Sequence, residues 1–199
     1  MKWEAKKFAD TIYAMNSISK KTVEEHLKLY AGYVAKYNEI QERLAALTDD
    51  DYAKANQTYS TIRELKVELT FAYGGIINHE IYFAHLGGKG GQPAGDLLKQ
   101  IEKDFGSFEK YKMDVKASGI AARGWVWTAW NHMEHRLFNY LGDAQNSFPV
   151  WGAMPVMAMD TYEHAYFIDF GAARAGYIDA FFQNIDWTQV EKNFGAMAK

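Results

Sequence analysis

Three histidines and one aspartate form the set of side chains in this chain that is best suited to hold a metal ion. His26 and His79 lie beside the apolar faces of two predicted helices, and Asp160 and His164 stand four residues apart where a predicted strand gives way to a helix. Three imidazoles and one carboxylate suit manganese or iron and leave a coordination position open. The competing interpretation is that the histidines pack in the core and that Asp160 caps a helix.

Helix geometry alone does not bring His26 and His79 together. Counted from the predicted turn at residues 48–51, His26 lies about 21 residues back and His79 about 28 residues onward, a difference in depth of roughly 10 Å at the rise of an α-helix. The pair Gly74-Gly75 interrupts the second helix. Glycine lowers helix stability, so the pair predicts a kink or a close approach of another backbone, and a kink would reduce the gap.

The remaining sequence offers no competing catalytic motif. His132 and His135 fall in a predicted hairpin turn, which is typical of solvent-facing side chains, and His85 stands apart from the other candidates. The chain has no GxSxG, no P-loop and no GxGxxG between a strand and a helix. The glycines of residues 87–91 follow a helix, which argues against a phosphate-binding loop. Cysteine is absent, which excludes thiolate chemistry, disulfides and cysteine-held metals.

Two long amphipathic helices are predicted to position the first two histidines. Ser19 or Thr22 begins the first helix, whose apolar positions run to Leu47. The segment at residues 48–51 ends it and caps a second pattern, which runs from Tyr52 to Leu86. Because both patterns alternate steps of three and four, we expect an antiparallel helical hairpin.

The predicted secondary structure changes from long helices to short helices and strands after the glycine-rich linker at residues 87–93. Short helices are predicted at 96–105 and 107–119, strands at 125–130, 136–140 and 156–159, and helices at 163–170, 177–183 and 188–194. The sequence therefore predicts an α+β fold. An N-terminal α-hairpin domain at 1–87 would precede a C-terminal α/β domain at 92–199 with a three-stranded antiparallel sheet and helices.

Composition limits the class of protein. The chain has 199 residues, of which 48% are hydrophobic and 16% aromatic, so it can bury a substantial core. The net charge of −3 gives no basic field for nucleic acid or an anionic membrane. The first residues lack the apolar region of a secretory signal, and no apolar run reaches the roughly 20 residues that span a bilayer. We therefore expect a cytoplasmic protein.

Six blocks of sequence resemble the iron/manganese superoxide dismutase family. The most specific are Gly74-Gly-Ile-Ile-Asn-His79 and Asp160-Thr-Tyr-Glu-His-Ala-Tyr166; the others lie at 18–26, 105–112, 124–127 and 184–187. The resemblance implies conversion of superoxide to dioxygen and hydrogen peroxide at a redox metal, one ion per subunit. It also implies a homodimer or tetramer, and it maps the metal ligands to His26, His79, Asp160 and His164.

The resemblance also indicates which metal is used. Iron-type members of the family carry a glutamine four residues before the second histidine, where this chain has Gly75. Manganese-type members take the glutamine from the loop before the last strand, where Gln145 fits. The resemblance therefore favours manganese, with iron as the second choice. Without the resemblance, Gln145 is equally well a plain turn residue.

Other family positions are changed or shifted. The gateway tyrosine maps to Tyr33 if this helix is one residue shorter than the family's, and Tyr30 is the alternative. Trp125 keeps the role of an aromatic wall. A further histidine, which the family carries on the first helix in addition to the ligand at His26, is missing here.

Three further positions follow the last ligand segment. Tyr162 replaces a tryptophan beside the metal, and Phe167 replaces the tyrosine that reaches across the dimer. Glu163 is implied to bridge to the histidine of the second subunit. These changes motivate an alternative function, a dismutase-like metal-binding or structural dimer with weak or no activity. A non-haem iron oxygenase is a third hypothesis, although such sites use two histidines and one carboxylate.

Overall fold

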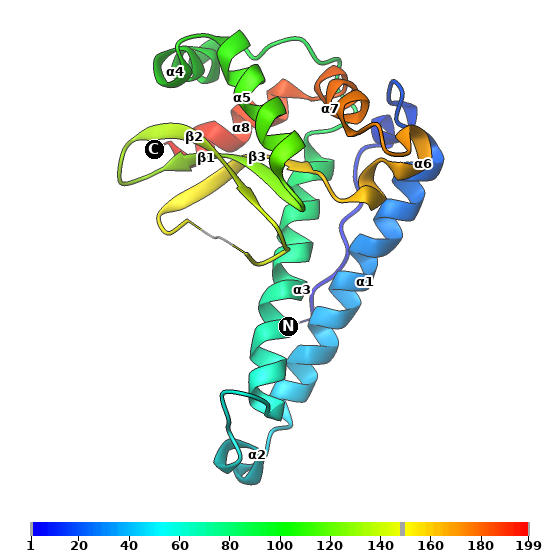
Figure 1. The fold of residues 1–199 in the computed structure, drawn as a ribbon, viewed down its shortest axis with the longest axis vertical. Helices are drawn as coiled ribbons and strands as arrows, with labels where there is room; N and C mark the ends of the chain where they lie inside the picture. Colours follow the sequence, from blue (N-terminus) through cyan, green and yellow to red (C-terminus); the bar gives the residue numbers. More distant parts are fainter. Residues whose placement is uncertain (1, 148–149, 199) are drawn as a thin grey trace.

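The fold places a long helical hairpin against a small sheet (Figure 1). The computed structural model describes residues 2–147 and 150–198. Helices α1 (Lys20–Ala45) and α3 (Thr61–Ala84) pack side by side as the predicted antiparallel pair. Of the two candidate caps, Ser19 is the one that begins α1, because its hydroxyl accepts from the backbone of Thr22. A 3-10 helix, η1 (Asp10–Ala14), precedes α1.

The second long helix begins later than the sequence predicted. Thr48 caps a short helix, α2 (Asp49–Ala53), through a capping box, and α3 starts only after the Ser60 cap. The predicted start near Tyr52 is therefore wrong. The capping signal at Thr48 begins α2, which ends at Ala53, and not the second long helix.

This late start also corrects the predicted mismatch in depth between the two histidines. His26 lies 19 residues before the end of α1 at Ala45, and His79 lies 18 residues after the start of α3 at Thr61. Because the two counts differ by a single residue, the histidines lie at nearly the same height in the hairpin. No kink is needed, and α3 is assigned as one uninterrupted helix through Gly74 and Gly75.

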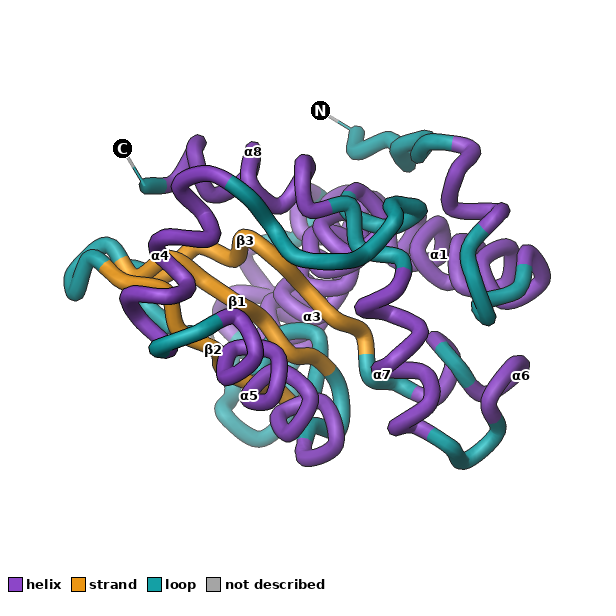
Figure 2. Tube along the Cα trace, turned by 90° about the horizontal axis from the view of Figure 1, so that it is seen from above, coloured by secondary structure: helices purple, strands orange, loops and turns teal. Residues whose placement is uncertain are grey.

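The second half of the chain builds the predicted sheet. Strands β1 (Trp125–Asn131), β2 (Arg136–Gly142) and β3 (Ala153–Asp160) form an antiparallel sheet in the order β2-β1-β3. Helices α4 (Gly95–Phe105) and α5 (Phe108–Ala121) contact β2, while α3 and α8 (Trp187–Met197) contact β3 (Figure 2). These packings confirm the α+β fold.

The segment after β3 differs from the single helix predicted at 163–170. It divides into a 3-10 turn, η2 (Glu163–Ala165), and a short helix, α6 (Phe167–Phe170). Tyr166 separates them because its φ of −144° is not helical. Helix α7 (Arg174–Gln183) follows. His164 lies in η2, only four residues after Asp160, and its Nε2 is 3.1 Å from Asp160 Oδ2.

Residues from both halves share one hydrophobic core, which includes Ile76 and Tyr82 of α3 together with Trp125, Val156 and Phe181. The glycine-rich linker runs against the C-terminal segment, where Gly88 donates to the Asn184 carbonyl at 2.9 Å. The division into domains 1–87 and 92–199 stays a prediction. No helix among the described residues combines the length and the apolar character needed to cross a bilayer.

Candidate metal centre

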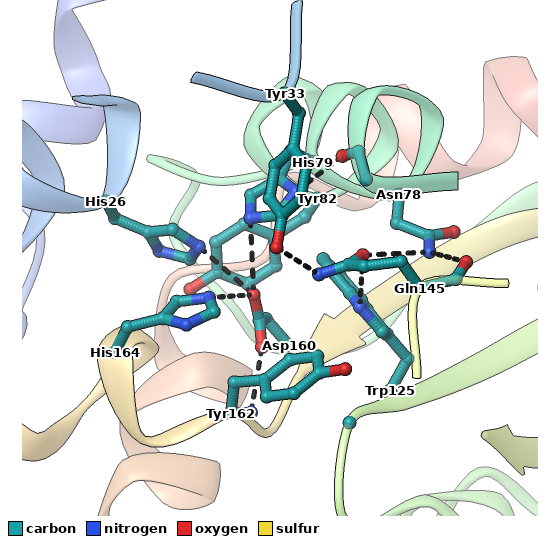
Figure 3. Close-up of polar contacts among 12 residues, drawn as sticks. His26, Tyr33, Asn78, His79, Tyr82, Trp125, Gln145, Asp160, Tyr162 and His164 are labelled. Carbon is teal, nitrogen blue, oxygen red and sulfur yellow. Dashed lines mark hydrogen bonds and ion pairs between the residues drawn. The ribbon is translucent and has the colours of Figure 1, made fainter. Parts of the chain in front are cut away.

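The four predicted ligands converge from four different elements. His26 comes from α1, His79 from α3, Asp160 from the end of β3 and His164 from η2 (Figure 3). One potential ligand atom of each residue lies within 4.8 Å of the others. Asp160 Oδ2 stands 3.0 Å from His26 Nε2, 3.1 Å from His164 Nε2 and 3.6 Å from His79 Nε2.

Burial and the attraction between Asp160 and His164 together set the charges of this cluster. His79 and Asp160 are fully buried, and His26 nearly so. Burial lowers the pKa of His26, and it lowers the pKa of His79 to about 3. Burial opposes ionisation of Asp160, but attraction to His164 and hydrogen bonds from His164 and His26 hold the pKa of that carboxyl well below its usual range. His26 and His79 are therefore neutral at pH 7 beside an anionic carboxylate, the protonation states that metal binding requires.

Hydrogen bonds outside the cluster orient two of its ligands. His79 Nδ1 donates to the Gly75 carbonyl at 2.5 Å, which leaves the lone pair on Nε2. Asp160 Oδ1 accepts from the Tyr162 backbone at 2.8 Å, and the Asp160 carbonyl accepts from the Tyr177 hydroxyl at 2.6 Å. Partners of this kind fix ligand geometry in metal sites.

The buried His79 Nε2 atom tests whether a metal fits here. It has no hydrogen-bond partner among the described residues, although it points into the cluster. An unsatisfied buried nitrogen is costly and needs an explanation. A metal ion held by three nitrogens and one carboxylate oxygen supplies the missing partner, so the residues present fit manganese or iron.

Gln145 lies beside the ligands at the centre of a hydrogen-bonded network (Figure 3). It is 4% exposed, and its Oε1 accepts from Trp125 Nε1 at 3.0 Å. Its Nε2 donates to the Tyr33 hydroxyl at 3.1 Å. Asn78 Nδ2 donates to both oxygens of Gln145, the backbone carbonyl at 3.1 Å and Oε1 at 3.4 Å, while Asn78 Oδ1 accepts from Trp127. Sequence reasoning missed Asn78, which directly precedes His79.

The glycine pair on α3 makes room for two residues of this network. A Cβ atom on Gly74 would lie 2.1 Å from the Gln145 carbonyl oxygen, and one on Gly75 would lie 2.6 Å from the Tyr33 ring. The predicted close backbone approach is therefore confirmed. At these two glycines, Gln145 of the loop before β3 and the Tyr33 side chain of α1 contact the same turn of α3.

Tyr33 and Tyr30 point to different surroundings. The Tyr33 ring lies 5.4 Å from the His79 ring, and its hydroxyl is directed toward the cluster and Gln145. Burial raises the pKa of Tyr33, so its hydroxyl stays protonated at neutral pH. The Tyr30 hydroxyl instead donates to Glu80 at 3.0 Å. Of the two candidates, only Tyr33 has its hydroxyl in the network of Gln145.

Of the remaining predicted residues, two pack against ligands of the cluster and two lie at the surface. Trp125 packs edge-on against His79 with ring centroids 5.2 Å apart, and Tyr162 stacks on His164 at 5.2 Å. Glu163 is exposed, and so is Phe167, with 54% of its surface accessible. Neither of these two side chains contributes a ligand to the cluster.

The other histidines do not join the cluster. His132 and His135 are exposed in the β1–β2 turn, as predicted. His85 is fully buried, and its Nε2 accepts from the backbone of Ala158 on β3 at 3.1 Å. Burial lowers the pKa of His85 to about 4. Its position two residues before the glycine-rich linker gave no sign of this burial.

Fold and site together define an α+β protein with a mononuclear metal site of three histidines and one aspartate, set between a helical hairpin and a three-stranded sheet. Residues 93–193 match the family model described as iron/manganese superoxide dismutases, C-terminal domain. The chain belongs to the iron/manganese superoxide dismutase family.

Individual relatives agree with this assignment and differ in their metal. A protein of Aquifex aeolicus named an iron superoxide dismutase is 46% identical over 90% of this chain and 85% of its own. An iron superoxide dismutase of Cupriavidus metallidurans is 36% identical over 93% and 92%. A manganese superoxide dismutase of Haloferax volcanii is 32% identical over 80% and 78%.

Proposed function

We propose that this chain is a superoxide dismutase that converts two superoxide anions and two protons into dioxygen and hydrogen peroxide. The observation that carries the proposal is the convergence of His26, His79, Asp160 and His164 with a buried, unpartnered His79 Nε2. When bound there, an ion that alternates between the +2 and +3 states supplies the one-electron chemistry.

The chain's own residues would orient the substrate and deliver protons. Tyr33 presents a protonated hydroxyl beside the cluster, and Gln145 holds that hydroxyl through its amide. Trp125 fixes the orientation of the Gln145 amide, because its indole N–H can bond only to the oxygen end. A positioned donor of this kind can pass a proton to a developing peroxide. Trp125 and Tyr162 form the aromatic walls that limit access of water.

For the metal we propose manganese, with iron as the second choice. Gly75 cannot supply an amide, while Gln145 reaches the site from the loop before β3, which is the arrangement that the family resemblance assigns to manganese. The relatives include iron and manganese enzymes, so the comparison supports a choice between these two metals and does not decide between them. Metal availability during expression also decides loading.

We further propose a homodimer or tetramer formed through the segment after β3. Phe167 and Ile168 expose large apolar side chains there, and Glu163 is exposed beside the ligand His164. A carboxylate from a second subunit would fix the tautomer of that histidine. Sedimentation of the wild-type chain and of Glu163→Ala tests this. The variant should associate more weakly and so dissociate at a higher protein concentration than the wild type. The absence of cysteine supports a reducing compartment, and we propose the cytoplasm.

Metal analysis combined with a superoxide-consumption assay tests the function. Purified wild-type protein should carry about one manganese or iron ion per chain and consume superoxide. Asp160→Ala should lose most of the metal and the activity, because it removes the anionic ligand from a buried site. Asp143→Ala, a carboxylate on the nearby loop, is the matched control and should keep both. A wild-type protein that binds metal without consuming superoxide would support the alternative, a metal-binding or structural dimer.

A further inference from the structure

A buried hydrogen bond joins the two ligand-bearing helices behind the metal site. Tyr30 lies one turn after His26 on α1, and Glu80 directly follows His79 on α3. The Tyr30 hydroxyl donates to Glu80 Oε1 at 3.0 Å, and both side chains are buried. The bond therefore crosses the hairpin within about one helical turn of both imidazoles.

Residues 2–8, the N-terminal strap, supply further donors to this bond. Trp3 Nε1 donates to Glu80 Oε1 at 3.0 Å, and the Lys6 ammonium pairs with Glu80 Oε2. The Lys6 backbone N–H donates to the Tyr30 hydroxyl at 2.9 Å. Glu80 is only 7% exposed, and a buried carboxylate is costly unless it is paired and hydrogen-bonded. Two of its three partners come from the strap.

The strap has an anchor of its own on the hairpin. Asn38 accepts from the Trp3 backbone N–H at 2.8 Å and donates to the Trp3 carbonyl at 2.9 Å, as a neighbouring strand would. The Trp3 ring packs edge-on against Tyr37 and Tyr73, with centroids 5.8 and 5.7 Å away. Because Trp3 is held independently, it can position Glu80.

We propose that Tyr30, Glu80 and the N-terminal strap form a positioning network that holds His79 against His26 and so slows the loss of the metal ion. The Tyr30 ring stacks 6.3 Å from the His79 ring, with the planes 29° apart. Movement of Tyr30 would therefore displace an imidazole. Release of the ion requires the ligands on α1 and α3 to separate, and the Tyr30–Glu80 bond opposes that separation. The inference rests on the proposed metal site and adds residues to it.

Three substitutions remove one donor each and test the network in the metal-loaded protein. Tyr30→Phe removes the hydroxyl, Trp3→Phe removes the indole N–H, and Lys6→Met removes the ammonium while keeping an unbranched side chain. We measure the rate of metal release to excess EDTA and the visible absorption spectrum of the bound metal. Each variant should release metal about threefold to tenfold faster, as expected for one lost hydrogen bond. Tyr30→Phe should also shift the spectrum, because the ring that stacks on His79 loses the hydrogen bond that holds it in place.

Tyr37→Phe is the matched control. It also removes a tyrosine hydroxyl from α1, and the Tyr37 ring also packs against Trp3. That hydroxyl accepts only from Gln41 among the described residues, so the release rate should equal that of the wild type. If all three test variants also release metal at the wild-type rate, the network does not hold the ligands.

Melting of the metal-free variants separates positioning from general stability. A lower melting temperature with an unchanged release rate and spectrum would assign the network a purely structural role and overturn the inference. Trp3→Phe keeps an aromatic ring and part of the packing against Tyr37 and Tyr73, so it should fold even if Tyr30→Phe does not. A wild-type protein that retains no metal would remove the proposed function itself, whereas a loaded and active wild type with unaffected variants would remove this inference alone.

Discussion

The ring of Tyr33 packs directly over the backbone of Gly75, so closely that a Cβ atom at position 75 would lie 2.6 Å from two ring carbons. Any side chain at 75 would collide with this tyrosine, so in this arrangement a glutamine at 75 and Tyr33 exclude one another. The side-chain amide beside Tyr33 comes instead from Gln145, whose backbone carbonyl oxygen would lie 2.1 Å from a Cβ atom on the neighbouring Gly74. Two adjacent glycines thus admit both partners of one hydrogen bond.

Gly75→Ala should therefore disturb the site by overpacking. The added methyl group must push the Tyr33 ring outward, which should destabilise the protein by about 1–3 kcal/mol and reduce superoxide consumption while the metal stays bound. Denaturant unfolding and metal analysis measure these effects. Gly32→Ala is the control, because a Cβ there has nothing within 4 Å and should be neutral or stabilising. Equal stability of the two variants would contradict the contact.

Gln145→Ala should reduce activity without removing the metal. The substitution leaves Trp125 Nε1 without its acceptor and Tyr33 without its donor, so the Tyr33 hydroxyl loses its fixed direction. We expect at least a tenfold loss of turnover, about 1.4 kcal/mol in the barrier, and a shifted metal reduction potential. Asn146→Ala, which only frees the hydroxyl of Thr70, should retain wild-type values. A Gln145→Ala protein with normal turnover would exclude this role.

The residue types and their order along the chain predicted the four ligands, but the distance between the two helix histidines could not be predicted correctly. The apolar periodicity predicted that the second long helix begins near Tyr52, because α2 has the same capping and apolar signals as the start of a long helix. The loop between Ala53 and Ser60 is what equalises the depths of His26 and His79. Such a loop leaves little trace in apolar spacing.

Residues that act through single hydrogen bonds were also beyond sequence reasoning. Asn78, Tyr177 and Glu80 lie on helices where polar residues are common, and their contacts cross between elements far apart in the chain. They are revealed only when α1 packs on α3, the loop before β3 reaches α3, and α7 reaches the end of β3. His85 is similar, since its partner on β3 is 73 residues away.

His85 should make the folded state sensitive to acid. Its folded pKa of about 4 lies below the ordinary value of 6.5, so the unfolded chain takes up a proton first as the pH falls. The stabilisation by neutral His85 is therefore complete above pH 6.5 and is lost as the pH drops toward 4, by about 3 kcal/mol.

Urea unfolding of His85→Gln and wild type between pH 7 and pH 4 checks this contribution. The variant cannot titrate at this position, and its side-chain oxygen can still accept from Ala158, so its stability should fall less steeply across that range. His132→Gln, in the exposed turn, is the control and should follow the wild type. Parallel curves for His85→Gln and wild type would contradict the prediction.

Tyr33→Phe and Tyr30→Phe should affect different properties of the enzyme. The Tyr33 hydroxyl faces the cluster and Gln145, whereas the Tyr30 hydroxyl is committed to Glu80 and the strap. Tyr33→Phe should therefore slow turnover at high superoxide concentration, where proton delivery limits the rate, by about tenfold and without loss of metal. Tyr30→Phe should leave that rate nearly unchanged and instead hasten metal release. Stopped-flow assays of freshly loaded proteins separate the two effects, because they finish before metal is lost. If Tyr30→Phe slows proton-limited turnover and Tyr33→Phe does not, the gateway lies one turn earlier on α1 than the structure indicates.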